Sequence, residues 1–145
     1  MTSNGRSPAE GVAVKSPPIV TAFWVGVASF LLTPVTALAK RRVIARATER
    51  LAKARGRTKV VAIAGSYGKT TAKEVLKTVL AEKYTVAATP GNLNTPLGTS
   101  TFIQSLKGNE EILIFEFGET HVGDIQELSE IVEPDIGVIT GINQA

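Results

Sequence analysis

Residues 59–71 read Lys-Val-Val-Ala-Ile-Ala-Gly-Ser-Tyr-Gly-Lys-Thr-Thr, and this stretch determines the fold class that we expect. Its first six residues are almost wholly apolar, as in a strand buried on both faces of a parallel sheet. Helical spacing of apolar residues follows at Ala72, Val75, Leu76, Val79 and Leu80. A glycine-containing loop between a buried strand and an amphipathic helix is typical of a phosphate-binding site.

The loop has the residue types that bind a phosphate chain. Gly65 and Gly68 allow a tight turn in which successive N–H groups form a concave nest, and the N-terminus of the next helix faces the same point. Lys69 can reach the β- and γ-phosphates, and the Thr70 hydroxyl can bind Mg²⁺. The longer form of this motif has a further glycine where Ile63 stands, so the match is to a shorter form, and an ordinary strand–helix turn is the alternative. The predicted phosphate-binding residues are Gly65, Ser66, Tyr67, Gly68, Lys69, Thr70 and Thr71.

Alternating strand and helix patterns continue to the end of the chain. The patterns predict strands over 84–88, 112–115 and 136–140 and helices over 97–106 and from 123–124 to Pro134. In the last helix we expect Asp124 to be the cap and Glu127 its capping-box partner. This alternation predicts an α/β fold with a parallel sheet and helices on both faces.

A second metal ligand is expected at the edge of the sheet where ligands bind. Glu116 directly follows the apolar strand 112–115, and the carboxyl ends of parallel strands meet at that edge. A carboxylate there can hold Mg²⁺ directly or through water, so we predict a magnesium site made by Thr70 and Glu116. A solvated glutamate is the alternative. His121, in the next loop, either faces a substrate or caps local structure.

Composition excludes several other kinds of site and divides the chain by charge. The 145 residues include no cysteine and one histidine, which excludes disulfides, thiolate zinc sites and multi-histidine metal sites. Residues 40–59 have nine basic residues and one acidic residue, a net charge of +8, whereas residues 60–145 have five basic and eleven acidic, a net charge of −6. A basic segment therefore separates an apolar N-terminal part from an acidic globular part.

The N-terminal part has the length and composition of a membrane span. Residues 16–39 hold no charge over 24 residues, about 36 Å as a helix, which exceeds the hydrocarbon thickness of about 30 Å. We predict disorder over 1–17 and a transmembrane helix over 18–39, in which Pro34 is tolerated because Ser and Thr neighbours satisfy the freed carbonyl. A signal peptide cleaved near Ala39 and a buried core helix are the alternatives.

The basic segment over 40–57 is expected to be a helix at the membrane surface. Val43, Ile44, Ala47, Leu51 and Ala54 share one side, which favours a helix lying on an anionic inner leaflet. A nucleic-acid-binding arm is the alternative, but no aromatic residue is interleaved for base stacking. Positive residues stay on the cytoplasmic side, so a single-pass topology with the C-terminus inside, at the cytoplasmic face of the inner membrane, is expected.

Four blocks of sequence together resemble the central ATP-binding domain of the Mur ligases, which build peptidoglycan precursors. The blocks are residues 65–71, 89–98 (Thr-Pro-Gly-Asn-Leu-Asn-Thr-Pro-Leu-Gly), 115–125 (Phe-Glu-Phe-Gly-Glu-Thr-His-Val-Gly-Asp-Ile) and 134–142 (Pro-Asp-Ile-Gly-Val-Ile-Thr-Gly-Ile). Within the family they look most like the members that add D-alanyl-D-alanine to the UDP-N-acetylmuramoyl tripeptide. The resemblance implies that residues 58–145 are the N-terminal part of that domain.

The resemblance also implies an activity, its substrates and roles for individual residues. ATP with Mg²⁺ would phosphorylate a muropeptide carboxylate, and the amine of D-alanyl-D-alanine or another amino component would displace phosphate from the acyl phosphate. Lys69 and Glu116 would be the catalytic pair. The residues implied at the substrate are Asn92, Asn94, Thr95 and His121.

Members of the family continue well beyond the position of Ala145, so we expect an N-terminal fragment that does not catalyse ligation alone. Two other functions stay open on the sequence. One is a different membrane-tethered phosphate-loop NTPase, although a guanine-reading Asn-Lys-x-Asp segment is absent. The other is a non-catalytic scaffold that retains the nucleotide site.

Overall fold

The computed structural model describes residues 18–91, 93–119 and 121–142. The chain divides into two compact units, residues 1–36 and residues 37–145, and the long first helix has residues in both. In chain order the elements are α1 (Pro18–Ala54), β1 (Lys59–Ala64), α2 (Lys69–Ala81), β2 (Val86–Ala88), α3 (Pro96–Ser105), β3 (Ile112–Glu116), α4 (Asp124–Val132) and β4 (Ile136–Ile139).

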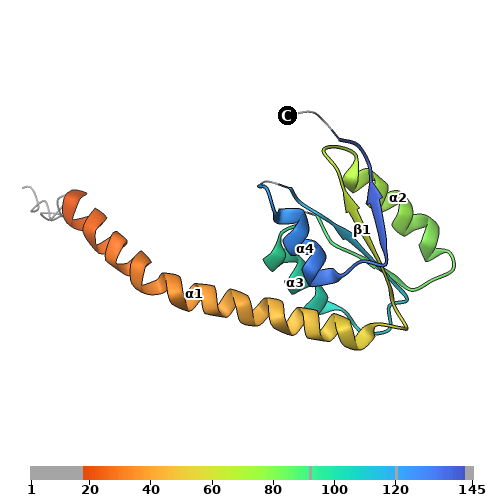
Figure 1. Cartoon of the computed structure of the whole chain (residues 1–145), viewed down its shortest axis with the longest axis horizontal. Coiled ribbons are helices and arrows are strands. Elements are labelled where there is room, and N and C mark those ends of the chain that lie inside the picture. Colours follow the sequence, from red (N-terminus) through yellow and green to blue (C-terminus); the bar gives the residue numbers. More distant parts are fainter. Residues whose placement is uncertain (1–17, 92, 120, 143–145) are drawn as a thin grey trace, which may run out of the picture. The chain divides into compact units, whose positions relative to one another are not determined.

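The four strands form one parallel sheet in the order β2-β3-β1-β4 (Figure 1). The predicted parallel α/β fold is therefore confirmed. Strand β2 is shorter than the predicted 84–88, because the Tyr84 N–H still bonds to the Leu80 carbonyl in the turn after α2 and the Thr85 N–H bonds to the Glu111 carboxylate.

Alternate residues of the central strands bury two separate apolar layers. Val61, Ile63 and Ile114 face α2, whose Ala72, Leu76 and Leu80 cover them. The opposite side contributes Val60, Ala62, Leu113 and Phe115 to a larger core that α3, α4 and the last part of α1 complete. Figure 1 shows α2 on one side of the sheet and α3 and α4 on the other. The predicted arrangement of helices on both faces is confirmed.

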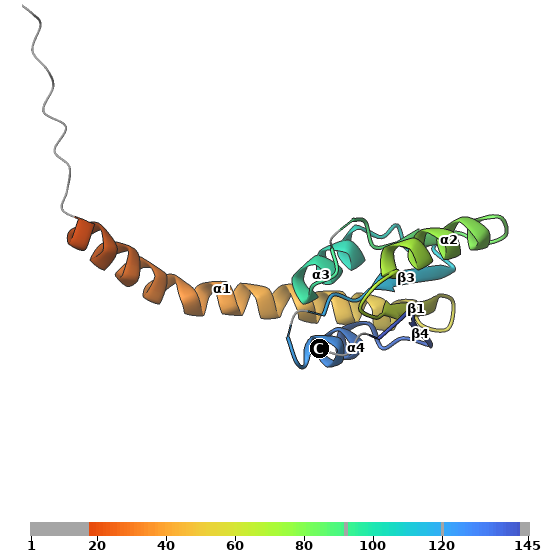
Figure 2. The same ribbon diagram turned by 90° about the horizontal axis from the view of Figure 1, so that it is seen from above.

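The C-terminal half of α1 belongs to the globular unit, which corrects the prediction for residues 40–57. Ala47 is fully buried and Leu51 is 3% exposed, and both belong to the core cluster that includes Phe102 of α3 and Leu128 of α4, with Ile44 against the same cluster. Figure 2 shows the last part of α1 alongside α3 and α4. The apolar side that we predicted to lie on a lipid leaflet is thus core. The compact unit of residues 37–145 therefore includes the last part of α1 together with residues 58–145.

Two arginines of the basic segment also hold α1 to its neighbours. Arg50 donates to the carbonyls of Gln104 and Leu106 at the end of α3. Arg55 donates to the Glu133 carbonyl at 2.8 Å and pairs with the Glu133 carboxylate at 2.6 Å. These contacts satisfy carbonyls at the C-terminal ends of α3 and α4, which is a favourable position for a cation.

The start of α4 differs from the predicted capping box. Gly123, at a φ of 101°, is the N-cap residue, and Asp124 is the first residue of the helix. The Asp124 carboxylate accepts the backbone N–H of His121 at 2.8 Å, so it stabilises the preceding turn. Acidic residues in the first turn still favour the helix dipole. The predicted inner face is confirmed, since Leu128 and Val132 are fully buried.

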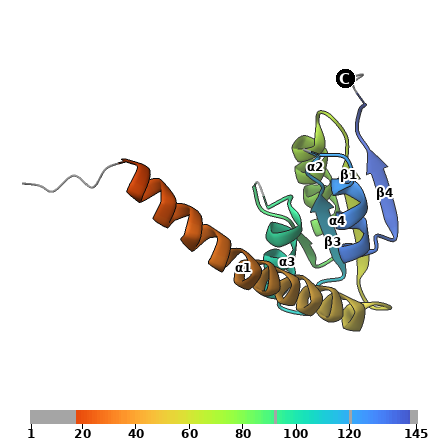
Figure 3. The same ribbon diagram turned by 60° about the vertical axis from the view of Figure 1, so that its left-hand side comes forward.

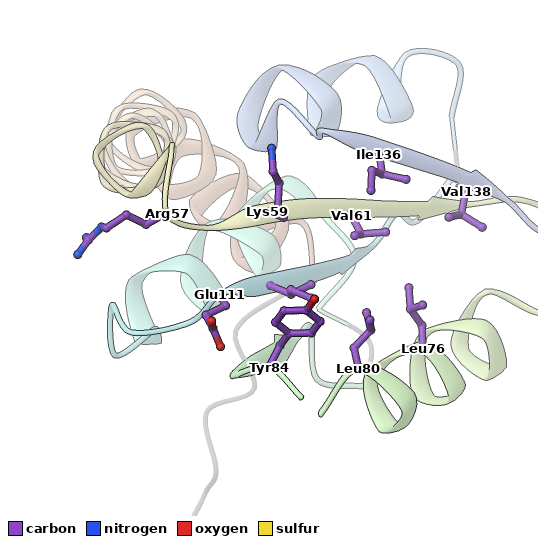
Figure 4. Close-up of a pocket in the computed structure, with 10 residues that line it drawn as sticks. Arg57, Lys59, Val61, Leu76, Leu80, Tyr84, Glu111, Ile136 and Val138 are labelled. Carbon is purple, nitrogen blue, oxygen red and sulfur yellow. The ribbon is translucent and has the colours of Figure 1, made fainter. Parts of the chain in front are cut away.

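One sheet edge and an adjoining cavity are apolar and accessible. Strand β4 lies at the edge (Figure 3), with Ile136 and Ile139 53% and 69% exposed. A cavity of about 520 Å³ is lined by Leu76 and Leu80 of α2, by Val61 of β1 and by Ile136 and Val138 of β4 (Figure 4). It lies toward the amino ends of the strands, the end opposite to that expected for a ligand of this fold class.

The first unit contains the apolar part of α1. The helix is the one described segment long and apolar enough to cross a membrane by length and composition, and its most apolar window is 0% buried. Thr33 donates to the Ser29 carbonyl at 2.6 Å. The carbonyl that Pro34 frees is that of Phe30, four residues before it, so the predicted satisfaction of that group stays a prediction.

If α1 completes the core, Leu51→Ala will lower the free energy of unfolding by about 2–5 kcal/mol, because it leaves a cavity among buried side chains. Leu38→Ala, on the same helix at a position 51% exposed, is the matched control and should change it by less than about 0.5 kcal/mol. Urea unfolding of the full chain in detergent measures both. Equal small effects would contradict the placement of α1 in the core.

Candidate functional site

The predicted phosphate loop connects β1 to α2 at the carboxyl end of the sheet. Gly65 has a φ of 137°, and Gly68, the N-cap residue of α2, has a φ of 77°. Side-chain-bearing residues rarely adopt either conformation, so both glycines are required by the backbone. The turn directs the N-terminus of a 13-residue helix at the space above the loop, where its partial positive charge favours an anion.

The end of β4 braces this loop from behind, a feature that the sequence analysis missed. The Thr140 hydroxyl donates to the Tyr67 carbonyl at 2.6 Å, and the Ser66 N–H donates to the Gly141 carbonyl at 2.7 Å. The ring of Tyr67 lies so close to Gly141 that a Cβ there would be 2.6 Å from it. The Ser66 amide is therefore engaged in the brace, and phosphate binding by the amides of the loop stays a prediction.

Thr70 and Glu116 meet, as predicted. The Thr70 hydroxyl donates to Glu116 Oε1 at 2.9 Å, which joins the first turn of α2 to the end of β3. Glu116 is 5% exposed, and its N–H donates to the hydroxyl of the buried Thr89 at 3.0 Å. The carboxylate is thus held from the backbone of β3 and from α2.

A cavity of about 360 Å³ lies over the loop. Residues 66–71, Asn94 and Glu116 line it. Asn94 comes from the loop after β2, and its carbonyl accepts the Gly118 N–H at 2.8 Å, which ties that loop to the one after β3. The fold therefore gathers most of the predicted site residues around one cavity.

Lys69 is half-buried in the loop, and its ammonium has two oxygen neighbours. It donates to the Gly65 carbonyl and lies 3.6 Å from Glu119 Oε1. Glu119 was not among the predicted site residues. Its position in the loop after β3 is the signal that was available, because that loop follows the strand that ends in Glu116.

Lys73 is the second residue that sequence reasoning missed. Its side chain is fully buried, and its ammonium lies 2.9 Å from Glu116 Oε2. It follows Thr70 by three residues, and side chains at that spacing share a helix face. The spacing was therefore the available signal, but a lysine in an amphipathic helix is most often solvated.

Two predicted residues that the structure describes, Thr95 and His121, are not among those that line the cavity. Thr95 is the N-cap of α3 and accepts the Gly98 N–H at 3.2 Å. His121 is 82% exposed, with Nδ1 3.8 Å from Asp124 Oδ2. Asn92 lies outside the described residues. Substrate contact by these three residues stays a prediction.

The donor set fits one magnesium ion shared with a nucleotide. A carboxylate oxygen and a hydroxyl oxygen adjoin at 2.9 Å, and both are hard ligands of the kind that Mg²⁺ prefers. The described residues contain no group of three or more His, Cys, Asp or Glu side chains that could hold a metal without other ligands. Such a site suits Mg²⁺, which is usually bound by one or two protein groups together with phosphates and water.

A parallel sheet with a glycine-lysine-threonine loop and a carboxylate at the end of the neighbouring strand defines the phosphate-loop class of nucleotide-binding proteins. The Mur ligase middle domain family matches residues 63–145. The chain therefore belongs to the Mur ligase family.

Individual relatives agree with this membership. The UDP-N-acetylmuramoyl-tripeptide--D-alanyl-D-alanine ligase of Borreliella burgdorferi is 46% identical over 87 residues, which are 60% of this chain and 19% of that protein. The ligase of the same name from Bacillus subtilis is 38% identical over 88 residues, 61% of this chain and 19% of that protein. The chain thus spans about a fifth of the length of these curated relatives.

Two solved structures of ligases named MurF have the same fold as this chain. MurF from Acinetobacter baumannii has a TM-score of 0.66 at 32% identity, covering 69% of this chain and 22% of that one. The MurF ligase of Thermotoga maritima, solved in complex with ADP, has a TM-score of 0.65 at 36% identity, covering 73% of this chain and 24% of that one. The predicted family and fold class are confirmed.

The brace predicts a stability difference between two glycines. A Cβ on Gly65 would lie 2.5 Å from the Thr140 hydroxyl in a strained backbone region, so Gly65→Ala should lower the free energy of unfolding by about 1–3 kcal/mol. Gly137→Ala, in β4 with nothing within 4 Å of the added carbon, is the control and should change it by less than about 0.5 kcal/mol. Chemical denaturation measures both, and a neutral Gly65→Ala would exclude the brace.

Proposed function

We propose that this chain supplies the nucleotide site of an ATP-dependent ligase of peptidoglycan precursor synthesis, one that joins D-alanyl-D-alanine or another amino component to a UDP-N-acetylmuramoyl peptide. The observation that supports it most is the contact of Thr70 with Glu116 beside Lys69, at the mouth of a glycine turn. Relatives at up to 46% identity have names that state this reaction.

The proposed reaction has two steps. A carboxylate oxygen of the muropeptide attacks the γ-phosphorus of ATP, and the bond from that phosphorus to the β,γ-bridging oxygen breaks. ADP is released, and the muropeptide becomes an acyl phosphate. The amine of the second substrate then attacks the acyl carbon, loses a proton and displaces phosphate, so that an amide forms. Such transfers depend on positioning and on neutralising the phosphate charge.

The residues of this chain would position the nucleotide for that transfer. The amides at the start of α2 would bind the phosphate chain, and Lys69 would leave the Gly65 carbonyl to offset charge on the γ-phosphate. Thr70 and Glu116 would hold Mg²⁺, which supplies charge neutralisation and orientation of the phosphates when bound. Asn94 would face the adjoining part of the cavity.

The chain matches only a small part of each relative, which bears on whether it can catalyse ligation alone. Because the chain spans about a fifth of its curated relatives, we propose that the 145 residues bind nucleotide without completing the ligation. Amide product formed by the purified chain from ATP, muropeptide and dipeptide would contradict this.

Lys69→Ala should weaken ATP binding with Mg²⁺ at least tenfold, about 1.4 kcal/mol, because it removes the cation at the phosphates. Lys77→Ala, an exposed lysine of the same helix, is the matched control and should leave affinity unchanged. Isothermal titration calorimetry of the full chain in detergent, with GTP as competitor, provides the measurement. No heat with ATP and magnesium in the unmodified chain would reject the proposal, and a preference for GTP would favour another NTPase.

We also propose that residues 18–39 anchor the protein in the inner membrane, with the globular unit in the cytoplasm. The supporting observations are the exposed apolar side chains of this part of α1, among them Phe23, Trp24 and Phe30, and the cationic residues that follow at Lys40, Arg41 and Arg42. Positive charge after an apolar helix favours retention of that side in the cytoplasm.

The absence of cysteine makes this topology testable by single-cysteine labelling. In cells treated with a membrane-impermeant maleimide, Ser3→Cys should be labelled and Asn109→Cys should be protected. Both should react after detergent permeabilisation, which controls for buried thiols. Labelling of Asn109→Cys in intact cells, or recovery of the protein in the soluble fraction, would refute the anchored topology.

A further inference from the structure

The buried lysine of α2 has no part in the scheme above. Lys73 is 0% exposed and does not line the cavity over the loop, so its ammonium does not face a bound phosphate there. Its close neighbour is Glu116 Oε2 at 2.9 Å, and Glu74 Oε1 follows at 3.7 Å. In the described part of the chain, neither Lys73 Nζ nor Glu116 Oε2 makes a hydrogen bond of normal geometry. Each atom therefore depends on the other as its charge partner.

A buried ion pair of this kind is not explained by stability. Taking two charges out of water is costly, and well-packed apolar residues of similar volume are often at least as stabilising. Leu76 and Leu80, farther along the same helix, show that apolar side chains pack against this face of the sheet. The ionic pair therefore indicates a requirement of the site.

The two oxygens of the Glu116 carboxylate have different partners, and both partners come from α2. Oε1 accepts the Thr70 hydroxyl at 2.9 Å, whereas Oε2 faces Lys73. Glu116 and Thr70 line the cavity, and Lys73 does not. Of the two oxygens, Oε1 is the one held beside the predicted metal ligand Thr70.

We propose that Lys73 is a positioning residue that holds Oε2 of Glu116 and so presents Oε1 alone to the magnesium ion of the nucleotide. This inference rests on the proposed function, because it presumes that Thr70 and Glu116 hold that ion. A lysine does this without competing for the metal, since an ammonium group offers no lone pair. Its effect passes through Glu116 and not through the phosphates.

The test is the ratio of nucleotide dissociation constants without and with magnesium. For ADP and the full chain in detergent, titrated in EDTA and then in excess Mg²⁺, we expect a ratio of about 5–150 in the unmodified protein, the usual range for coupled ligands. Lys73→Met should lower this ratio by at least about threefold and leave the affinity in EDTA unchanged. Lys77→Met, on the same helix but 48% exposed, is the matched control and should keep the full ratio.

A purely structural role gives a different result. Lys73→Met would then lower the melting temperature but retain the magnesium ratio, which would overturn the proposal. Lys73→Gln, whose amide can still donate toward Glu116 Oε2, is the conservative variant and should retain more of the magnesium ratio than Lys73→Met. A double variant keeps the proposal testable if Lys73→Met does not fold. In Lys73→Met/Glu116→Gln no buried charge lacks a partner, and its affinities with and without magnesium should equal those of Glu116→Gln. A lower affinity in EDTA for the double variant would show that Lys73 acts directly on the nucleotide and would also overturn the proposal.

The same titrations distinguish failure of the proposed magnesium site from failure of the proposed role of Lys73. If the unmodified protein binds ADP with no magnesium dependence, the metal site of the proposed function is wrong and this inference is wrong with it. If the unmodified protein shows the dependence and Lys73→Met shows it equally, only the role of Lys73 is wrong.

Discussion

The contact between the start of α2 and the end of β3 is the constraint on which the site depends. A carboxylate that is 5% exposed has to be held by its neighbours, and Thr70 and Lys73 hold it from one helix. That helix can present both side chains only if it begins directly after the glycine turn. The glycine turn is itself positioned by β1, which precedes it, and by the brace from the end of β4. Loop, helix and three strands are therefore fixed together.

The phosphate loop is supported by residues from distant parts of the chain. The brace residues Thr140 and Gly141 follow the loop by more than seventy positions, yet they contact its backbone directly. A parallel sheet makes this possible, because the carboxyl ends of all its strands reach one edge. The same edge receives the loop after β2, so that Asn94 lies beside Glu116 in the cavity lining.

Much of the fold was predictable because local patterns and tertiary structure agree. Strand β1, helix α2 and the face of α4 around Leu128 follow directly from apolar periodicity. The predicted surface role of residues 40–57 was wrong in part, since an apolar stripe among cations fits a lipid leaflet and a protein core equally well. Local pattern does not identify the partner of a helix face. The partner here comes from α3 and α4, at least forty residues later.

The limits of prediction at the site have a similar physical origin. Lys69, Thr70 and Glu116 were identifiable because each stands at the end of an element, next to a glycine turn or after an apolar strand. Lys73 stands inside a helix, where a lysine usually reaches water, and its burial depends on Glu116 lying opposite. Thr95 shows the converse case, because a polar residue beside the cleft is used by its own helix as a cap.

The sharing of α1 between the two units restricts how this protein can be shortened. A soluble version that starts at β1 would remove Ile44, Ala47 and Leu51 and leave apolar side chains of α3 and α4 facing water. A truncation that keeps the core intact has to fall before residue 43, because the Val43 carbonyl accepts the Gln104 side chain and Ile44 packs against the core. A protease that cuts within the last turns of α1 would likewise not release the globular unit intact, because those turns supply residues of its core.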